Sequence, residues 1–183
     1  MRRVTFALNI SIDGYCDHTS FSPSEDLMDY FTNLMHNVDL LFYGRIMYQL
    51  MFPYWADVAN NQTGTPDEIR FAERLTAIDK VVVSTTLKTA DHNIHIIRSN
   101  PVDELLRLKQ LPGKEISVDS VSMLPEFIKA GLIDEFNLVV HPVIVGRGRP
   151  FLSAGSLIDN QYLKLAETIN FKSGCVAFRY LKP

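Results

Sequence analysis

The hydrophobic positions of this chain form short continuous runs that alternate with stretches of helical spacing. The runs are rich in β-branched and aromatic residues and end near glycine, proline, asparagine or aspartate, which is typical of strands. They predict strands over residues 3–12, 39–43, 80–84, 94–97 and 115–118. Strands that alternate with helices indicate a largely parallel sheet with right-handed crossovers.

The helices are expected between these strands. Ser22-Pro23-Ser24-Glu25 and Thr65-Pro66-Asp67-Glu68 each read as a capping box with proline at the first helical position. Apolar residues then recur at helical spacing: Leu27, Phe31, Leu34 and Val38 after the first box, and Ile69, Ala72 and Leu75 after the second. Two later helices are predicted, one from 100 to 111 with Leu105, Leu108 and Leu111 inside, and one over 121–130, ended by Gly131.

A shorter helix is expected directly after the second strand. It carries Ile46, Met47, Leu50 and Met51 and runs up to Pro53. Residues 53–67 then form the longest irregular segment of the chain. Because apolar periodicity resumes within a few residues, this segment is interpreted as a surface loop within one domain.

The segment 136–145 is the most continuously apolar part of the chain, and it is followed by the loop Gly146-Arg147-Gly148. A strand without a polar face belongs near the middle of a sheet that helices cover on both sides. The ranges 162–171 and 175–181 predict an antiparallel hairpin that turns at 172–174. The expected fold is therefore α/β, a three-layer αβα sandwich whose mixed, mostly parallel sheet ends in an antiparallel hairpin, with residues 1–183 as a single domain.

Composition narrows the classes of function. The chain has 183 residues, of which 46% are hydrophobic and 21% charged, and its net charge is −3. This balance gives no electrostatic reason to expect nucleic acid or an anionic membrane as a partner. The N-terminus enters a strand without an apolar leader, no run approaches the length of a membrane span, and two cysteines make no disulfide framework. A cytoplasmic protein is expected.

The string from Gly131 to Pro150, GLIDEFNLVVHPVIVGRGRP, is similar to a signature of the dihydrofolate-reductase-like superfamily. Within it, the chain most resembles the reductase domain at the C-terminus of the bifunctional riboflavin-biosynthesis deaminase-reductase and its stand-alone relatives. Other landmarks follow in matching order: Ile12-Asp13-Gly14, Tyr43-Gly44-Arg45 and Val83-Ser84-Thr85-Thr86-Leu87. The resemblance implies the same α/β fold, NADPH as cofactor, a small-molecule substrate and a homodimer.

Three strand-to-helix junctions have residues suited to binding phosphate, because helix N-termini present free N–H groups and the positive end of a dipole. They are Gly44-Arg45, Ser84-Thr85-Thr86 and Asp119-Ser120-Val121-Ser122. Each can also be explained as ordinary backbone geometry or helix capping. The resemblance implies that Arg45 and Ser84 to Thr86 lie near the 2′-phosphate of NADPH, and Ser120 to Ser122 near its pyrophosphate.

Two carboxyl groups are candidates for the donor of the proton that reduction of an imine-like bond requires. Asp26 lies early in the first helix, where the resemblance to dihydrofolate reductases implies a catalytic carboxylate. Asp13 closes the first strand on the ligand side. The alternatives are that Asp26 only complements the helix dipole and that Asp13 is only a turn residue.

The expected activity is NADPH-dependent reduction of a small heterocycle. The substrate remains open among pterins, pyrimidines and compounds like the substrate of a 5-amino-6-(5-phosphoribosylamino)uracil reductase. The riboflavin branch carries an acidic residue at the position of Val118, so Val118 favours a substrate outside that pathway. The alternative is a weakly active or non-catalytic ligand-binding member with a degraded cofactor site. Met47 and Asp119 favour it, since relatives carry small residues at both positions. No metal site is expected, and His92 and His95 are interpreted as solvated.

Overall fold

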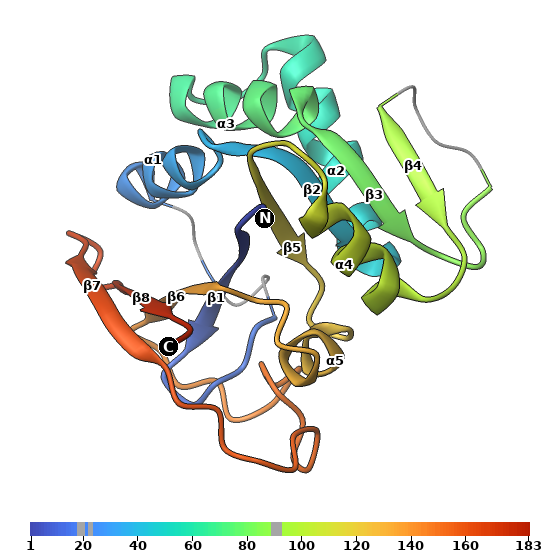
Figure 1. Ribbon diagram of the computed structural model, residues 1–183. Coiled ribbons are helices and arrows are strands. Elements are labelled where there is room, and N and C mark those ends of the chain that lie inside the picture. The colour runs from blue at the N-terminus through green and yellow to red at the C-terminus, as the bar shows by residue number, and fades with distance from the viewer. Residues whose placement is uncertain (18–20, 22–23, 89–92) are drawn as a thin grey trace.

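The computed structural model of the chain describes residues 1–17, 21, 24–88 and 93–183. Its strands are β1 (Val4–Ser11), β2 (Val38–Gly44), β3 (Asp79–Val83), β4 (Ile94–Ile97), β5 (Glu115–Asp119), β6 (Glu135–His141), β7 (Lys164–Asn170) and β8 (Val176–Leu181). They form an 8-stranded sheet in the order β4-β3-β2-β5-β1-β6-β8-β7 (Figure 1). The first six strands pair in parallel, whereas β8 pairs antiparallel with β6 and β7. The predicted mixed sheet with a C-terminal hairpin is confirmed.

The helices cover both faces of the sheet. They are α1 (Glu25–Leu34), α2 (Arg45–Asn61), α3 (Pro66–Ala77), α4 (Pro101–Gln110) and α5 (Leu124–Lys129). Leu41, Tyr43 and Val82 of the sheet pack with α1, α2 and α3, whereas Phe6 and Phe42 pack with α4 and α5. This arrangement confirms the three-layer αβα sandwich. In the described part of the chain, no helix combines the length and apolar character that crossing a membrane requires.

The order of the strands creates a point where the winding of the chain reverses. From β1 through β4 the chain moves toward one edge of the sheet, and from β4 through β6 it returns toward the other. The connection that leaves β2 and the one that leaves β5 therefore run in opposite directions from neighbouring strands. In open α/β sheets, ligands bind beyond the carboxyl ends of the strands at such a switch point.

The helix after β2 was predicted too short. It continues through Pro53 to Asn61, so the irregular segment expected over 53–67 is mostly helical. The ring of Pro53 removes one backbone hydrogen bond. The following turns compensate because Val58 is buried and the Trp55 ring packs against Phe71 of α3 at 4.7 Å between centroids. The helix instead ends at Gln62, which adopts the left-handed conformation with φ of 53°.

The first helix also differs from its prediction. It begins at Glu25 and ends at Leu34, so Val38 starts β2 instead of extending the helix. Residues 22 and 23 of the predicted capping box lie outside the described residues. Ser24 is the N-cap but makes no side-chain cap; its hydroxyl donates to Asp26 at 2.5 Å. The second box is confirmed, since Thr65 and Glu68 cap each other reciprocally.

Three elements in the C-terminal half of the chain have other boundaries than the sequence predicted. The strand predicted over 136–145 ends at His141, where Pro142 interrupts the ladder, and Ile144 is 72% exposed in the following loop. The helix predicted over 121–130 is α5, only 6 residues long, because 121–123 form turns before it. Leu111 lies beyond the end of α4 as its C-cap and is exposed.

Candidate functional site

The fold places the three predicted junctions next to one another at the winding reversal. Strands β3, β2 and β5 are neighbours, and Gly44 at the end of β2 pairs with Val83, the residue before Ser84. On the other side of β2, a Cβ atom added at Gly44 would lie 2.6 Å from Ser120 Oγ. Glycine is therefore required here by close packing of the β2 end against the β5 end. The sequence predicted these junctions separately, and the strand order brings them together.

The N-terminus of α2 is suited to an anion. Gly44 is its N-cap, so no side chain caps the helix, and its first turn contains no acidic residue. Arg45, the first helical residue, is exposed, and its guanidinium donates to Gln49 Oε1 at 2.7 Å along the helix. Uncapped N–H groups, a positive dipole end and a nearby guanidinium are the features that bind phosphate.

The second junction is a turn organised by Ser84. The buried Ser84 hydroxyl accepts hydrogen bonds from the backbone N–H groups of Thr86 (3.2 Å) and Leu87 (2.9 Å). The guanidinium of Arg98 donates to the carbonyls of Ser84 and Leu87, each at 2.7 Å. Ser84 thus has the structural role that capping predicts, while Thr85 and Thr86 are exposed. The sequence offered no signal for Arg98, which adds a positive charge beside this turn.

The third junction borders a small cavity. The Oγ atoms of Ser120 and Ser122 lie 3.3 Å apart, and Ser120 is buried. The cavity, of about 240 Å³, is lined by Val121, Ser122, Pro125, Arg149, Pro150, Phe151, Leu152 and Ser153. Arg149, which the sequence reasoning missed, comes from the loop after β6 and brings a third positive charge to the junctions, after Arg45 and Arg98. Its signal was the Gly-Arg-Gly-Arg pattern that ends the motif.

Asp119 is the last residue of β5 and pairs with Tyr43 across the switch point. Its Oδ2 atom is buried and has no hydrogen-bond partner among the described residues. Burial raises the pKa of Asp119 to about 7, although a hydrogen bond from the Ser117 side chain acts in the opposite direction. Burial, and then the charge of Asp119, raise the pKa of Tyr43 well above its usual value. This carboxyl group therefore carries a proton for a large fraction of the time at neutral pH.

Asp13 anchors the loop after β6. Its carboxylate accepts hydrogen bonds from Val145 N (3.2 Å) and Gly146 N (2.7 Å), and Gly146 has a positive φ of 69°. The hydrogen bond from the Ser11 side chain, and then those from the loop backbone, lower the pKa of Asp13. Asp13 is thus ionised and holds a turn, as its non-catalytic interpretation expects.

Asp26 also makes structural contacts. It accepts hydrogen bonds from the Ser24 hydroxyl at 2.5 Å and from Lys172 N at 3.0 Å, which ties the β7–β8 turn to the start of α1. The Ser24 bond, and then the backbone bonds, lower the pKa of Asp26, although partial burial raises it. Its assignment as a proton donor stays a prediction, made less favourable by this ionised state.

A hydrogen-bonded row of polar side chains lies between β1, β6 and β8, on the face of the sheet that α1 covers. His141 Nε2 lies 2.9 Å from Asn9 Oδ1, and His141 Nδ1 lies 3.3 Å from Cys175 Sγ. The ring of Phe21 stacks on the imidazole at 4.3 Å. Burial lowers the pKa of His141, so the neutral ring donates from Nε2 to Asn9 and accepts from the Cys175 thiol.

The remaining candidates fall outside the site. Met47 packs against the core cluster of α1, α2 and α3, and Val118 is buried on the opposite face of the sheet with α4 and α5. His95 is exposed on β4, as its solvated interpretation predicted, whereas residue 92 lies outside the described residues. No group of three or more metal-binding side chains occurs within the described ranges.

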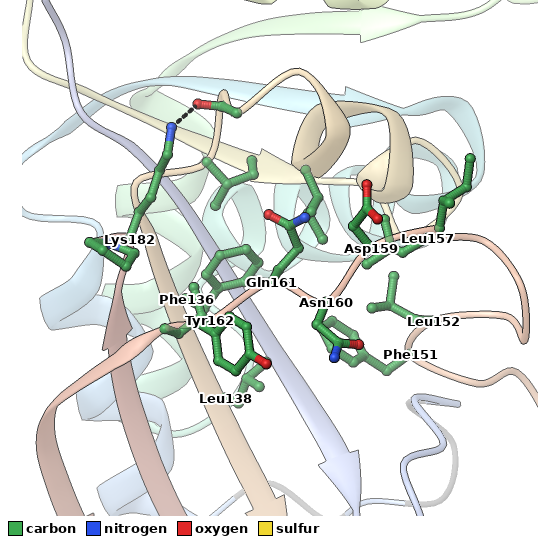
Figure 2. A pocket seen from close by; sticks show the side chains of 16 residues that line it. Phe136, Leu138, Phe151, Leu152, Leu157, Asp159, Asn160, Gln161, Tyr162 and Lys182 are labelled. Atoms are coloured by element: carbon green, nitrogen blue, oxygen red, sulfur yellow. Dashed lines mark hydrogen bonds between the residues drawn. The ribbon is translucent and has the colours of Figure 1, made fainter.

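A second cavity, of about 570 Å³, shares Phe151 and Leu152 with the first and extends from there along Phe136 and Leu138 of β6 (Figure 2). Its walls are largely apolar: Ile128, Ile133, Phe136, Leu138, Phe151, Leu152, Leu157, Ile158, Tyr162 and Leu163. Asp159, Asn160, Gln161 and Lys182 lie at its rim, and Lys182 Nζ donates to the carbonyl of Gly131 at 2.8 Å. Because most of its walls are apolar, this cavity favours apolar contact.

Known proteins resemble this chain in sequence and in fold. A family model, the RibD C-terminal domain, matches residues 2–177. The uncharacterized protein YyaP of Bacillus subtilis (strain 168) is 30% identical over 184 residues, which cover 98% of this chain and 94% of that protein.

Solved structures agree on the fold. A protein of Shewanella sp. PV-4 assigned to riboflavin biosynthesis superposes with a TM-score of 0.73 at 19% identity, covering 100% of this chain and 99% of that one. A pyrimidine reductase-like protein of Corynebacterium diphtheriae gives 0.65 at 14% identity, with 98% and 91% covered. Dihydrofolate reductase of Enterococcus faecalis, complexed with NADP(H) and RAB-propyl, gives 0.64 at 10% identity, with 98% and 96% covered. At these identities the three structures establish the fold alone.

Proposed function

The chain belongs to the RibD C-terminal domain family, and from this premise we propose that it is an NADPH-dependent reductase of a small heterocycle. One observation carries the proposal. The phosphate-binding features of three junctions meet at the point where the winding of the sheet reverses, with Gly44 packed directly against Ser120. The match to reductase folds supports the class of reaction, and the junctions support the cofactor.

The described residues fit a dinucleotide. The α2 N-terminus has no side-chain cap to displace, and its first turn has no acidic residue to repel a phosphate. We assign the 2′-phosphate end to Arg45, Thr85 and Thr86, with Ser84 shaping the turn. The pyrophosphate end falls to Ser120, Val121 and Ser122, where Arg149 borders the same cavity as Ser122. When bound, the nicotinamide would supply the hydride, while the chain binds, orients and protonates the substrate.

The proposed substrate class follows from the hydrogen-bond acceptors to which the site can donate. The nitrogen or oxygen of a small heterocycle can receive a hydrogen bond from a protonated carboxyl group or a hydroxyl. Pterins and pyrimidines both present such atoms, so both remain within the proposal. Val118, at the position where the riboflavin branch carries an acidic residue, favours a substrate other than that of the riboflavin pathway.

A homodimer forms part of the proposal. The outermost strand β7 is exposed along nearly its whole length, and its Leu165 is 50% exposed. Tyr162, which lines the larger cavity just before β7, is 79% exposed. An exposed edge strand next to an apolar cavity is a surface that soluble proteins usually cover. Light scattering of the wild type and of Leu165→Lys tests this, with Ile46→Lys on α2 as an exposed control. A wild type that is monomeric at all concentrations contradicts it.

Thermal unfolding with NADPH and NADH tests the cofactor assignment. NADPH should raise the melting temperature more than NADH does. At a hundredfold excess over its dissociation constant, NADPH should stabilise the folded chain by about 2.7 kcal/mol. Arg45→Ala should weaken NADPH about 10- to 100-fold and NADH far less, because only NADPH carries the extra phosphate. Arg107→Ala is the matched control, since Arg107 is also exposed on a helix and pairs within it, with Glu104.

The alternative function is distinguished by the same experiment. A family member that binds a ligand without catalysis is favoured by Asp119, because an ionised carboxylate at the β5 end would repel a pyrophosphate. Equal shifts for the two cofactors, or none for either, contradict the reductase proposal and favour this alternative. Quenching of Trp55, the only tryptophan, gives an independent measure of binding because α2 begins at the proposed phosphate site.

A further inference from the structure

Asp119 occupies the position in the fold where a reacting group would be placed. It ends β5, its neighbour Ser120 packs against Gly44 of β2, and its own partner across the strands is Tyr43. Its side chain therefore lies at the switch point, within one residue of the junctions proposed to hold the cofactor.

The contacts of Asp119 leave one oxygen without a structural role. The side chain of Ser117 hydrogen-bonds to the carboxyl group, whereas Oδ2 is buried and has no partner within the described part of the chain. Buried polar atoms are nearly always paired, and leaving one unpaired costs free energy. In contrast, both oxygens of Asp13 and both of Asp26 accept hydrogen bonds that hold loops in place. Asp119 is thus the carboxyl at this edge with a buried oxygen that holds no described part of the fold in place.

The groups that face Asp119 favour its neutral form. Tyr43 on β2 is a buried phenol, the tilted ring of Tyr48 of α2 lies behind it with ring centroids 6.4 Å apart, and Ser117 is a neutral hydroxyl. On β1, Thr5 pairs with Ser117 and is also neutral. No cation among the described residues appears as a cause of the shift in the pKa of Asp119, and burial is its dominant cause. A carboxylic acid in such surroundings can donate a hydrogen bond at neutral pH.

We propose that Asp119 is the acid of this site: its protonated carboxyl donates a hydrogen bond from Oδ2 to a nitrogen or oxygen of the bound heterocycle and transfers that proton during reduction. The inference rests on the proposed reductase function. In the step, the O–H bond of Asp119 breaks and an N–H or O–H bond forms on the substrate, while the adjacent carbon is reduced by a hydride that a dihydronicotinamide supplies. The carboxylate then regains a proton from water.

As a proton donor, Asp119 has a role in the site, although its ionised form would repel a pyrophosphate. Asp119 is the last residue of β5 and would alter the chemistry of the site without altering the fold. This role also predicts that ligand affinity depends on pH in a direction opposite to that of an ionised base. Binding should weaken as pH rises and the donor is lost.

The decisive measurement is a pH titration of the ligand-free chain by infrared difference spectroscopy. The wild type minus Asp119→Asn should show one carboxyl signal that titrates near pH 7. Ser117→Ala should move that midpoint to higher pH, because it removes the one hydrogen bond that lowers the pKa of Asp119. Asp57→Asn, an exposed residue of α2, should leave it unchanged. A signal that titrates near pH 4 overturns the inference, whether or not NADPH binds.

The second measurement uses uracil as a probe with two carbonyl acceptors. A single donor with a pKa near 7 is about tenfold less protonated at pH 8 than at pH 6. Uracil should therefore bind the wild type about tenfold more weakly at pH 8, and Asp119→Asn should show no such change. Binding that is absent, or equally dependent on pH in both proteins, overturns the inference. Its failure is separable from that of the proposed function, which the melting shift with NADPH tests independently.

Discussion

Replacing Asp119 by asparagine should stabilise the folded chain at neutral and alkaline pH. The substitution keeps the shape of the side chain but removes the carboxylate that burial disfavours. In the folded state the pKa of Asp119 is raised from 3.8 to about 7. Between these values the folded chain retains a proton that the unfolded chain has released, so the stability of the wild type falls as pH rises.

The size of the effect follows from the shift. Each pKa unit corresponds to about 1.4 kcal/mol, so the full shift is worth about 4 kcal/mol above pH 7. Asp119 as a whole residue is only half-buried even though Oδ2 is fully buried, and solvent screening reduces the effect to about 2–3 kcal/mol. The difference in unfolding free energy between Asp119→Asn and the wild type should be near zero at pH 4 and reach this value by pH 8.

Urea unfolding of both proteins between pH 4 and pH 9 measures this difference directly. The subtraction removes the contribution of every other titrating group, and Asp57→Asn provides a control that should stay flat. A difference that does not change with pH would refute the buried neutral carboxyl. A variant that is less stable at every pH would instead mean that Asp119 makes a hydrogen bond the fold needs.

Three further outcomes follow from the packing. Asp13→Asn should speed amide exchange of residues 145–148, because a weaker acceptor replaces the charged anchor of Gly146, while amides of β3 stay unchanged. Gly44→Ala should cost about 1–3 kcal/mol in urea unfolding because its Cβ would meet Ser120 Oγ, and Ser120→Gly in the same chain should restore part of the loss. Trp55→Ala should cost about 2–4 kcal/mol through lost packing on Phe71; a loss below about 0.5 kcal/mol would mean that this contact does not hold α2 beyond Pro53.

The sequence by itself determined the order of strands and helices, the parallel sheet and the residues at the strand ends. These features are local, because strand and helix periodicity and glycine at tight turns depend on near neighbours in the chain. Gly44, Ser84 and Ser120 could therefore be placed at junctions before their distances were known. The resemblance of the motifs then led to the hypothesis that the junctions bind one ligand.

The boundaries of the elements were decided by tertiary packing. The chain continues as a helix through Pro53 because Trp55 and Val58 find apolar partners there, and no local pattern reports the position of α3. Conversely, Val143 to Val145 look like strand residues but have no strand to pair with beyond Pro142. An apolar run predicts a strand only where a neighbouring strand extends equally far.

The protonation states of the carboxyl groups also depended on the tertiary structure. In the sequence, Asp13, Asp26 and Asp119 are all acidic residues at the ends or starts of elements. In the fold, the first two accept backbone hydrogen bonds that favour their charged form, whereas Oδ2 of Asp119 is buried without a partner. A pKa depends on burial and on groups distant in the chain, such as Tyr43, so the acid of the site could be inferred only from the assembled sheet.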